Sequence, residues 1–289
     1  MAQFINHALL PVSLAIIMLS IGLSVRWADF KALKQQKTAI VSGFILQVIA
    51  LPLLAFLLLH VFAVQGEYAV AIMIVACCPG GVTSNAITFI FSGVVALSVV
   101  LTLLSSIVAP LTIPFITDWS LGYFIGEQTR HEFALIPTVG KLLLLSIVPI
   151  IIGNIIRHFY AGWCSKNSRY LRRFSGILFL FVITLMAVIN FHLLANVISH
   201  IGLFIVLMSS CSIVLGFFTG VLLRLPSPVC LTLSIEVGIQ NAGMGLIITG
   251  AVLNHPAMSM VLITYGIVMQ IPLFAFAACY RYRQALLLD

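Results

Sequence analysis

Long apolar segments follow one another along almost the entire chain, separated by short polar connections. A helix needs about 20 apolar residues to cross a bilayer, so each such segment predicts one membrane-spanning helix. We predict nine, at residues 4–24, 38–62, 66–92, 94–118, 136–158, 173–195, 199–223, 228–253 and 257–281. The first has no basic leader and no small-residue cleavage site, so we expect a span rather than a signal peptide. The pattern predicts a helical bundle with no room for a separate soluble domain.

Two of these segments are interrupted near their middle by glycine and polar residues. Residues 76–88 read ACCPGGVTSNAIT, and residues 230–250 read CLTLSIEVGIQNAGMGLIITG. Non-helical backbone at membrane depth is tolerated only where it is buried in protein or lines a cavity, because lipid cannot satisfy its polar groups. Interrupted segments in corresponding positions of two halves indicate the binding site of a transporter.

The two interruptions divide the chain into two repeats. The broken segment 66–92 is the third of four in residues 1–118, and the broken segment 228–253 is the fourth of five in residues 136–289. An external loop at 119–135 joins the halves, and the first repeat resembles the second without its opening helix. Because the loop charges place the ends of the broken segments on opposite sides of the membrane, we expect inverted repeats whose two discontinuous helices cross.

Composition places the chain in the membrane. Of its 289 residues, 62% are hydrophobic and 7% are charged, with a mean hydropathy of +1.22, whereas soluble domains carry about 25% charged residues. The fold class predicted is therefore an all-α integral membrane protein. The six cysteines show no CxxC or His–Cys spacing typical of metal sites, so we expect them to be small buried side chains.

The charged residues predict the orientation. Twelve of the fourteen basic residues lie in or next to the loops on one side: Arg26, Lys31, Lys34, Lys37, Arg157, Lys166, Arg169, Arg172, Arg173, Arg224, Arg281 and Arg283. The alternate loops hold Arg130 and Lys141 with four acidic residues, Glu67, Asp118, Glu127 and Glu132. The positive-inside rule then places the N-terminus outside and the C-terminus in the cytoplasm of a plasma-membrane protein. This distribution argues against a nucleic-acid partner for the net charge of +7.

Glu236 is the acidic residue predicted to lie deep inside a span. An ionised carboxylate there costs about 2.5–3.5 kcal/mol on insertion scales, and no predicted span offers a basic residue at similar depth. A proton or a metal ion is therefore the expected partner. Neutral oxygens in other spans favour a hard cation, and one carboxylate among neutral ligands suits sodium. These oxygens come from Gln47, Ser84, Asn85, Ser98, Thr102 and Gln240.

Several of these residues also have a structural interpretation. Ser98 and Thr102, four apart on one helix face, belong to residue types that often hydrogen-bond within or between membrane helices. Gln47 precedes Pro52 and is placed to satisfy backbone loosened by that proline, and Glu236 is open to a protonated structural role. The coincidence of an unpaired acid with two matched interruptions favours the ion site.

At these residues the chain resembles the bile acid:sodium symporter family, as a bacterial member. The similarity lies in CCPGGVTSNAI at 77–87, GVVALSVVLTLLSSIVAP at 93–110 and LTLSIEVGIQNAG at 231–243, and extends to IIMLSIGLSVRWADF at 16–30. It implies a core domain that holds the two crossing helices, a flatter panel domain, and a substrate cleft between them.

The resemblance also implies two sodium ions. One site would comprise Ser84, Asn85, Ser98, Thr102 and Glu236. The other would comprise Gln47, Glu236 and Gln240, with backbone oxygens near Val237 and Ile239. Asn241, and also Gln270, would lie near the substrate.

The chain departs from related bacterial proteins in two respects. Those commonly have ten helices, whereas nine resembles the animal branch. Their last helix can carry a His-Asn pair where this chain has Gln270 and Ile271. We therefore treat bile acids as a family label rather than as the expected substrate.

The sequence thus favours a sodium-coupled symporter of an organic anion, bile-acid-like or a small carboxylate, that works by alternating access. Its expected partners are the lipid bilayer and the anion, with no obligate protein partner. A proton-coupled or sodium-independent carrier is the alternative. A channel is a remoter one, as is a membrane-embedded enzyme, because no histidine accompanies Ser84 or Ser98 at catalytic spacing.

Overall fold

The structure is a computed structural model that describes residues 2–25 and 36–286. Throughout these ranges the regular structure is helical. The first half comprises α1 (Ala2–Phe4), η1 (Ile5–Leu9), α2 (Leu10–Ser24), α4 (Lys37–Ile45), η2 (Leu46–Ala50), α5 (Leu51–Val61), α6 (Gly66–Ala76), α7 (Val82–Ile90) and α8 (Val95–Phe124). The remainder comprises α9 (Glu127–Glu132), α10 (Leu135–Phe159), α11 (Ala161–Ile189), α12 (Phe191–Leu222), α13 (Ser227–Gly238), α14 (Ala242–Leu246), η3 (Ile247–Val252), α15 (Pro256–Val268) and α16 (Gln270–Leu286).

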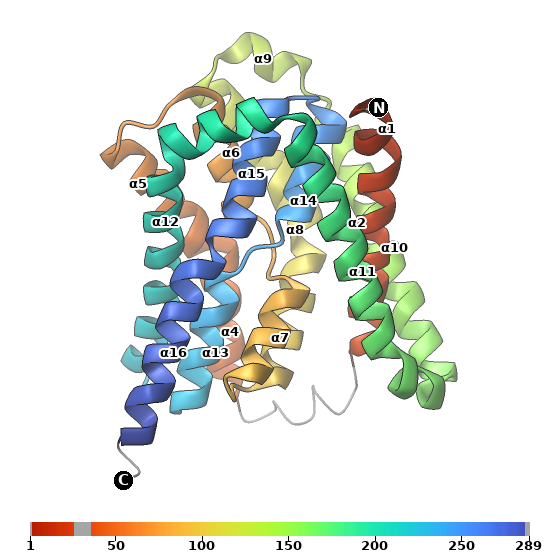
Figure 1. The fold of residues 1–289 in the computed structure, drawn as a ribbon, viewed down its shortest axis with the longest axis vertical. Coiled ribbons are helices and arrows are strands. Elements are labelled where there is room, and N and C mark those ends of the chain that lie inside the picture. The colour runs from red at the N-terminus through yellow and green to blue at the C-terminus, as the bar shows by residue number, and fades with distance from the viewer. Residues whose placement is uncertain (1, 26–35, 287–289) are drawn as a thin grey trace.

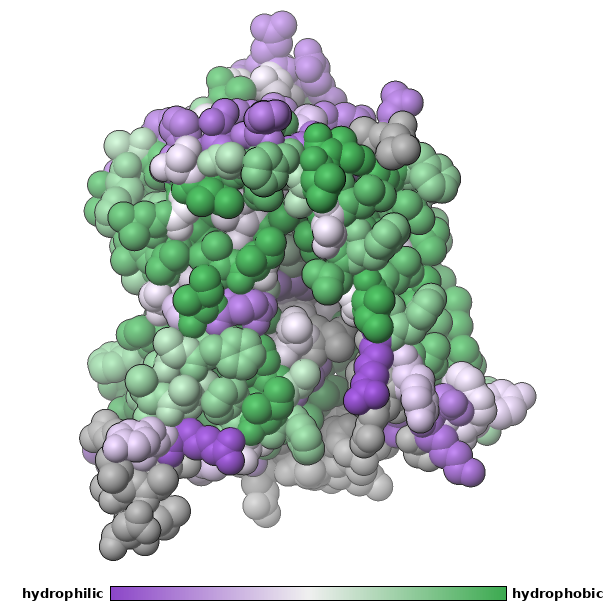
Figure 2. Space-filling view, in the orientation of Figure 1, coloured by the Kyte–Doolittle hydropathy of each residue, from purple (hydrophilic) through white to green (hydrophobic). Residues whose placement is uncertain are grey.

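Seven helical segments within the described ranges are long and apolar enough to cross a membrane, and one of them, Ser227–Val252, contains the second interruption. Two of the predicted segments correspond instead to shorter apolar helices, Gly66–Ala76 and Arg173–Ile189. Large apolar side chains face outwards along most of the bundle, where Figure 2 shows a hydrophobic band between two more polar ends. An all-α membrane protein is the architecture that this surface requires, because water would not stabilise such a band.

Two predicted boundaries differ from the structure. The chain turns at Asn190, whose Nδ2 donates to the Met186 carbonyl at 2.9 Å, so α12 begins at Phe191 rather than near residue 199. The predicted external loop at 119–135 is largely helical, because α8 continues to Phe124 and α9 follows. Apolar length alone gave no sign of either helix end.

Charged residues at the helix ends segregate along the bundle axis. The described basic residues Lys37, Arg157, Arg224 and Arg281 belong to helix ends or connections, and Lys166 and Arg173 to the first half of α11; the connecting ends of these helices lie on the side of the C-terminus in Figure 1. Arg26, Lys31 and Lys34 lie outside the described residues, as do the side chains of Arg169, Arg172 and Arg283.

Three helices form one closely packed group. α2 packs along α10 and also against α11, and these lie together on one side of the molecule (Figure 1). The approach of α2 to α10 is close enough that a Cβ on Gly22 would overlap the Ile150 carbonyl, and one on Gly153 would overlap the Leu19 carbonyl. Arg157 adds a hydrogen bond to the Leu23 carbonyl. Small residues that admit such backbone contact are typical of helix pairs in membranes.

The remaining helices pack around the interrupted segments. α12 lies along α13 and α15, and α6 packs against both α8 and α15. In consequence α13 and α14 are enclosed: every residue from Val229 to Ala251 is buried. The molecule therefore has a group of α2, α10 and α11 beside a larger group that contains both interruptions.

The contact between α2 and α10 yields a test with a control on the same helix. We expect Gly153→Ala to lower the free energy of unfolding by about 1–3 kcal/mol, because the added methyl overlaps backbone that cannot move aside. Gly140→Ala should be neutral or stabilising, since a Cβ there meets open space. Apparent melting temperatures of the purified variants in detergent compare the two, and equal melting temperatures would contradict the packing.

Candidate cation site at the helix crossing

The two interruptions lie against each other in space. α6 ends at Ala76 and α7 begins at Val82, while α13 ends at Gly238 and α14 begins at Ala242. The backbone N–H of Asn241 in the second break donates to the carbonyl of Pro79 in the first, at 2.8 Å. Each break thus satisfies a backbone group of the other, as membrane burial demands.

The Glu236 carboxylate sits beside this junction with no solvent exposure. Ser98 Oγ donates to Glu236 Oε2 at 2.6 Å, and Thr102 Oγ1 donates to Oε1. Their spacing of four places both hydroxyls on one face of α8, so a single helix face offers both donors. Neither hydroxyl forms a hydrogen bond to its own helix within the described residues, so both act between helices, on the Glu236 carboxylate of α13.

Oxygen atoms outnumber hydrogen-bond donors around Ser98. Its Oγ lies 2.7 Å from Asn85 Oδ1 as well as 2.6 Å from Glu236 Oε2. A serine hydroxyl carries one proton and can donate to only one of them at a time. The three oxygens therefore converge with one proton between them, an arrangement that a bound cation would stabilise.

Ser84 lies at the same place with a different set of contacts. Its buried Oγ donates to the Gly81 carbonyl at 2.6 Å, and its side chain also faces the Glu236 carboxylate. The bond to Gly81 is the local structural role expected of serine near a helix start. The structure brings Ser84, Asn85, Ser98, Thr102 and Glu236 into one cluster.

The first break requires glycine at position 80, because the Glu236 carboxylate lies against the backbone there. A Cβ at this position would overlap Glu236 Oε1 and lie 3.1 Å from Gln47 Nε2. The carboxylate thus reaches the backbone of the break, and only glycine leaves it room.

A second polar group lies on the backbone side of Glu236. Gln47 in η2 donates from Nε2 to the Glu236 carbonyl at 3.1 Å, and Gln240 Nε2 donates to the Val237 carbonyl at 2.8 Å. The Oε1 atoms of both glutamines are buried without a hydrogen-bond partner. Gln47 thus binds across to α13 rather than to backbone near Pro52, and the two free oxygens are available to a ligand.

Asn241 and Gln270 occupy different surroundings. Asn241 is nearly buried, its Nδ2 has no hydrogen-bond partner, and its Oδ1 and the Phe179 ring of α11 both approach Gly243. Gln270 is partly buried, and its described hydrogen bond goes from Nε2 to the Gly266 carbonyl of α15 at 3.5 Å. The structure therefore ties Asn241 directly to the junction through its N–H, and gives no such tie for Gln270.

Sequence reasoning missed two neighbours of the junction. Met269 Sδ accepts a hydrogen bond from the Gln240 N–H at 3.4 Å, and Phe179 meets Gly243 from the other helix group. Nothing in the spacing of either residue signalled this, since both contacts depend on how distant helices pack.

No group of three His, Cys, Asp or Glu side chains that could hold a metal ion occurs in the part of the chain that the structure describes. A cation at the junction would thus be bound by one carboxylate and neutral oxygens, a ligand set of the hard type.

The family model for the sodium bile acid symporter family matches residues 11–198. The chain belongs to the sodium bile acid symporter family. This symporter-family chain is 30% identical over 236 residues to an uncharacterized sodium-dependent transporter of Bacillus subtilis, with 82% of the chain and 72% of that relative covered.

Other relatives share less of their length with it. A probable chloroplastic sodium/metabolite cotransporter of Oryza sativa is 28% identical over 85% of the chain and 59% of the relative. Human sodium/bile acid cotransporter 4 is 27% identical over 82% of the chain and 55% of the relative. The chain thus spans somewhat over half the length of these two. Together with the apolar helices, these relatives support a multi-pass, sodium-coupled membrane transporter.

The close approach at Gly80 predicts a local sensitivity. We expect Gly80→Ala to destabilise the protein by about 1–3 kcal/mol, because the methyl displaces the Glu236 carboxylate from its hydroxyl donors. Gly81→Ala is the matched control, since the nearest atom to its Cβ is the movable Thr83 hydroxyl at 3.2 Å. Melting temperatures without sodium check this, and a larger loss in Gly81→Ala would contradict the geometry.

Proposed function

We propose that the chain is a sodium-coupled symporter of an organic anion, bile-acid-like or a small carboxylate, that works by alternating access. The observation that carries the proposal is the Glu236 carboxylate, fully buried at the crossing of two interrupted helices. Among the described residues no basic side chain pairs with it. A bound cation offsets the cost of an ionised carboxylate at this depth.

We assign one sodium ion to the cluster of Ser84, Asn85, Ser98, Thr102 and Glu236. The excess of oxygens over protons around Ser98 supports this assignment. On binding, the ion would release the Ser98 hydroxyl from its two competing acceptors and neutralise Glu236.

We assign a second ion to Gln47, Glu236, Val237, Ile239 and Gln240. The unpartnered Oε1 atoms of Gln47 and Gln240 support it, because buried acceptors without partners are costly unless a ligand satisfies them. Gln47 belongs to η2, a π-helical turn, and such turns often occur at functional sites. The two sites would share Glu236, so that its substitution would weaken both.

The proposed architecture follows from the two helix groups. The group of α2, α10 and α11 would be the panel domain, and the helices around the interruptions the core domain. Residues 1–118 and 136–289, which contain four and five of the nine proposed spans, would be inverted repeats. The described basic residues at the C-terminal end of the bundle support a cytoplasmic C-terminus and an external N-terminus.

The anion would bind between the domains, next to the junction. α7 begins at Val82, and the segment of α14 and η3 begins at Ala242, so both helix starts lie beside the breaks. Helix N-termini attract negative charge, and in transporters such half-helices face anionic groups. The free Nδ2 of Asn241 would donate to the substrate, and Gln270 would line the cleft nearby. Sodium and anion that each favour one arrangement of the domains are coupled by reciprocal linkage.

Proton coupling or sodium-independent transport is the second candidate. Ser98 and Thr102 already donate to the Glu236 carboxylate, and this pair of bonds is the observation that favours a carrier without a metal ion. A proton-coupled carrier would keep its flux without sodium and lose it when a pH gradient is removed.

Sodium-dependent stabilisation of the purified protein tests the proposal. A ligand that binds only the folded form at 100 times its Kd stabilises it by about 2.7 kcal/mol. We expect sodium chloride to raise the melting temperature above that in equimolar potassium chloride, and we expect Glu236→Gln to abolish the difference. Glu67→Gln, which changes an acid paired with His255 on the surface, should keep it. Equal effects of both salts on the melting temperature of the wild type would contradict sodium coupling.

Each proposed site can be removed by its own single substitution, and both substitutions should have the same effect on the number of bound sodium ions. Ser98→Ala removes a ligand of the first site and Gln47→Leu removes one of the second. Each should weaken sodium stabilisation and lower the number of ions in its concentration dependence from two to one, because the other site remains. Ser106→Ala, on the same helix as Ser98 but outside the cluster, is the control. An unchanged ion number in either variant would argue against the site it was designed to remove.

A further inference from the structure

The two ends of the boundary between the helix groups differ. Figure 2 shows a hollow in the lower half of the molecule, on the side of the C-terminus, between the α11 side and the α13 and α16 side. At the opposite end, η1 packs against η3 and α11 packs against α15, so the boundary between the two helix groups is closed there. We call this closed part the outer seam, formed by Asn6, Lys141, Asn190, Gly250, Ala251 and Ser259.

A lysine crosses the outer seam. Lys141 of α10 donates from Nζ to the carbonyl of Ala251, in the last turn of η3, at 3.1 Å. Carbonyls in the last turn of a helix lack partners in the helix itself, and its partial negative charge there favours a cation. The bond therefore joins the group of α2, α10 and α11 to a segment of the group that holds the interruptions.

Lys141 has no acidic partner among the described residues, in contrast to the other basic residue at this end. Arg130 donates to Asp118 at 2.9 Å, and this bond and the nearby Glu127 raise the pKa of the guanidinium. The Lys141 side chain is partly buried, so its charge is held by the Ala251 carbonyl rather than by a counter-ion. Burying a cation without a counter-ion costs free energy, which argues against a purely structural role for this contact.

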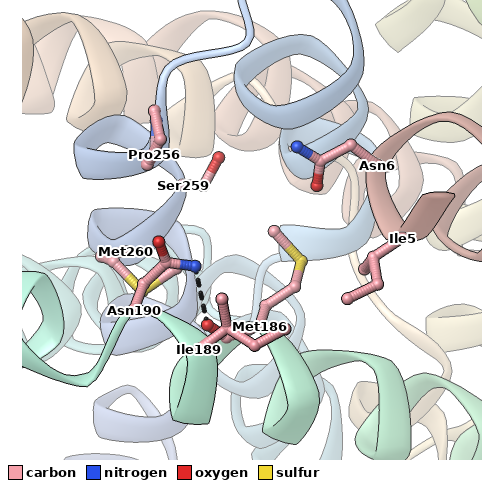
Figure 3. A pocket seen from close by; sticks show the side chains of 8 residues that line it. All are labelled: Ile5, Asn6, Met186, Ile189, Asn190, Pro256, Ser259 and Met260. Carbon is pink, nitrogen blue, oxygen red and sulfur yellow. Dashed lines mark hydrogen bonds between the residues drawn. The ribbon is translucent and has the colours of Figure 1, made fainter. Parts of the chain in front are cut away.

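The rest of the outer seam combines polar side chains with a cavity whose lining is mostly apolar, from Ile5, Met186, Ile189, Pro256 and Met260. Ser259 Oγ donates to Thr249 Oγ1 at 3.0 Å, and a Cβ on Gly250 would lie between Asn6 Oδ1 and Ser259 Oγ, at 3.4 and 3.5 Å. Figure 3 shows Asn6 across a cavity from Asn190 and Ser259. Its volume of about 40 Å³ is sufficient for water.

We propose that the outer seam is the external gate of the carrier and that the bond from Lys141 to Ala251 is its latch. This rests on the proposed alternating access, and it adds the residue that holds one state closed. Breaking the bond exposes polar groups that water can satisfy at once, so opening costs less than it would in an apolar seam. It also frees the Lys141 ammonium at the mouth of the cleft, where positive charge attracts an arriving anion.

Cysteine accessibility in the purified full-length protein tests the latch. We place Ser259→Cys in the seam and measure its rate of modification by a maleimide, resolved by peptide mass spectrometry from the native cysteines. Lys141→Met keeps the length and apolar stem of the lysine but cannot donate. We expect it to raise the modification rate about tenfold, since a hydrogen bond from a charged group is among the stronger kind. Lys166→Met, an exposed lysine near the start of α11, should leave the rate unchanged.

A second reporter distinguishes gating from general loosening. Thr83→Cys is exposed near the start of α7, a helix that lies on the side of the C-terminus in Figure 1. If Lys141→Met shifts the carrier towards opening at the outer seam, modification of Thr83→Cys must slow while that of Ser259→Cys accelerates. An unchanged Ser259→Cys rate, or acceleration at both positions, would overturn the latch. Neither rate requires sodium or substrate, so this result is separate from the sodium-stabilisation experiment.

Discussion

A carboxylate buried inside a membrane protein sets the conditions that its surroundings must meet. Glu236 has no solvent exposure, so its carboxylate must be either protonated or paired with nearby groups that stabilise its charge. One face of α8 supplies two hydroxyls, Gly80 leaves space for Oε1, and Gln47 reaches the backbone carbonyl of the same residue. Four chain segments are thus fixed relative to one another by one side chain. An exchange of its partner, whether an ion or a proton, acts on all of them together.

The interruptions gain their stability from each other. A break in one helix leaves N–H and C=O groups that lipid cannot satisfy, and the bond from Asn241 to Pro79 satisfies one group from each break. Neither interrupted segment would hold its conformation at membrane depth alone. Their mutual contact keeps the helix starts of α7 and α14 close to each other.

Apolar length and residue spacing were enough to predict much of this arrangement. Segment lengths predicted the helical membrane class because the hydrocarbon core of a bilayer is about 30 Å thick and sets the length of a span. The spacing of Ser98 and Thr102 predicted a shared face because helix geometry is fixed. The partner of Gln47, the approach of Phe179 to Gly243 and the bond from Lys141 to Ala251 could not be predicted. They join segments far apart in sequence, and their register depends on packing that no local pattern encodes. The end of α11 at Asn190 was missed because both flanks are equally apolar.

The kinds of contact within and between the helix groups have different mechanical consequences. α2 and α10 meet through glycine, with backbone against backbone, and such an interface resists sliding because any shift creates overlap or voids. The outer seam is joined instead by a lysine, small polar side chains and a cavity, which exchange protein contacts for water at modest cost. In the proposed mechanism, separation at the outer seam would therefore cost less than deformation of the contact between α2 and α10. The alternating access proposed above would require that order of stiffness, which follows from where glycine and polar residues lie in the chain.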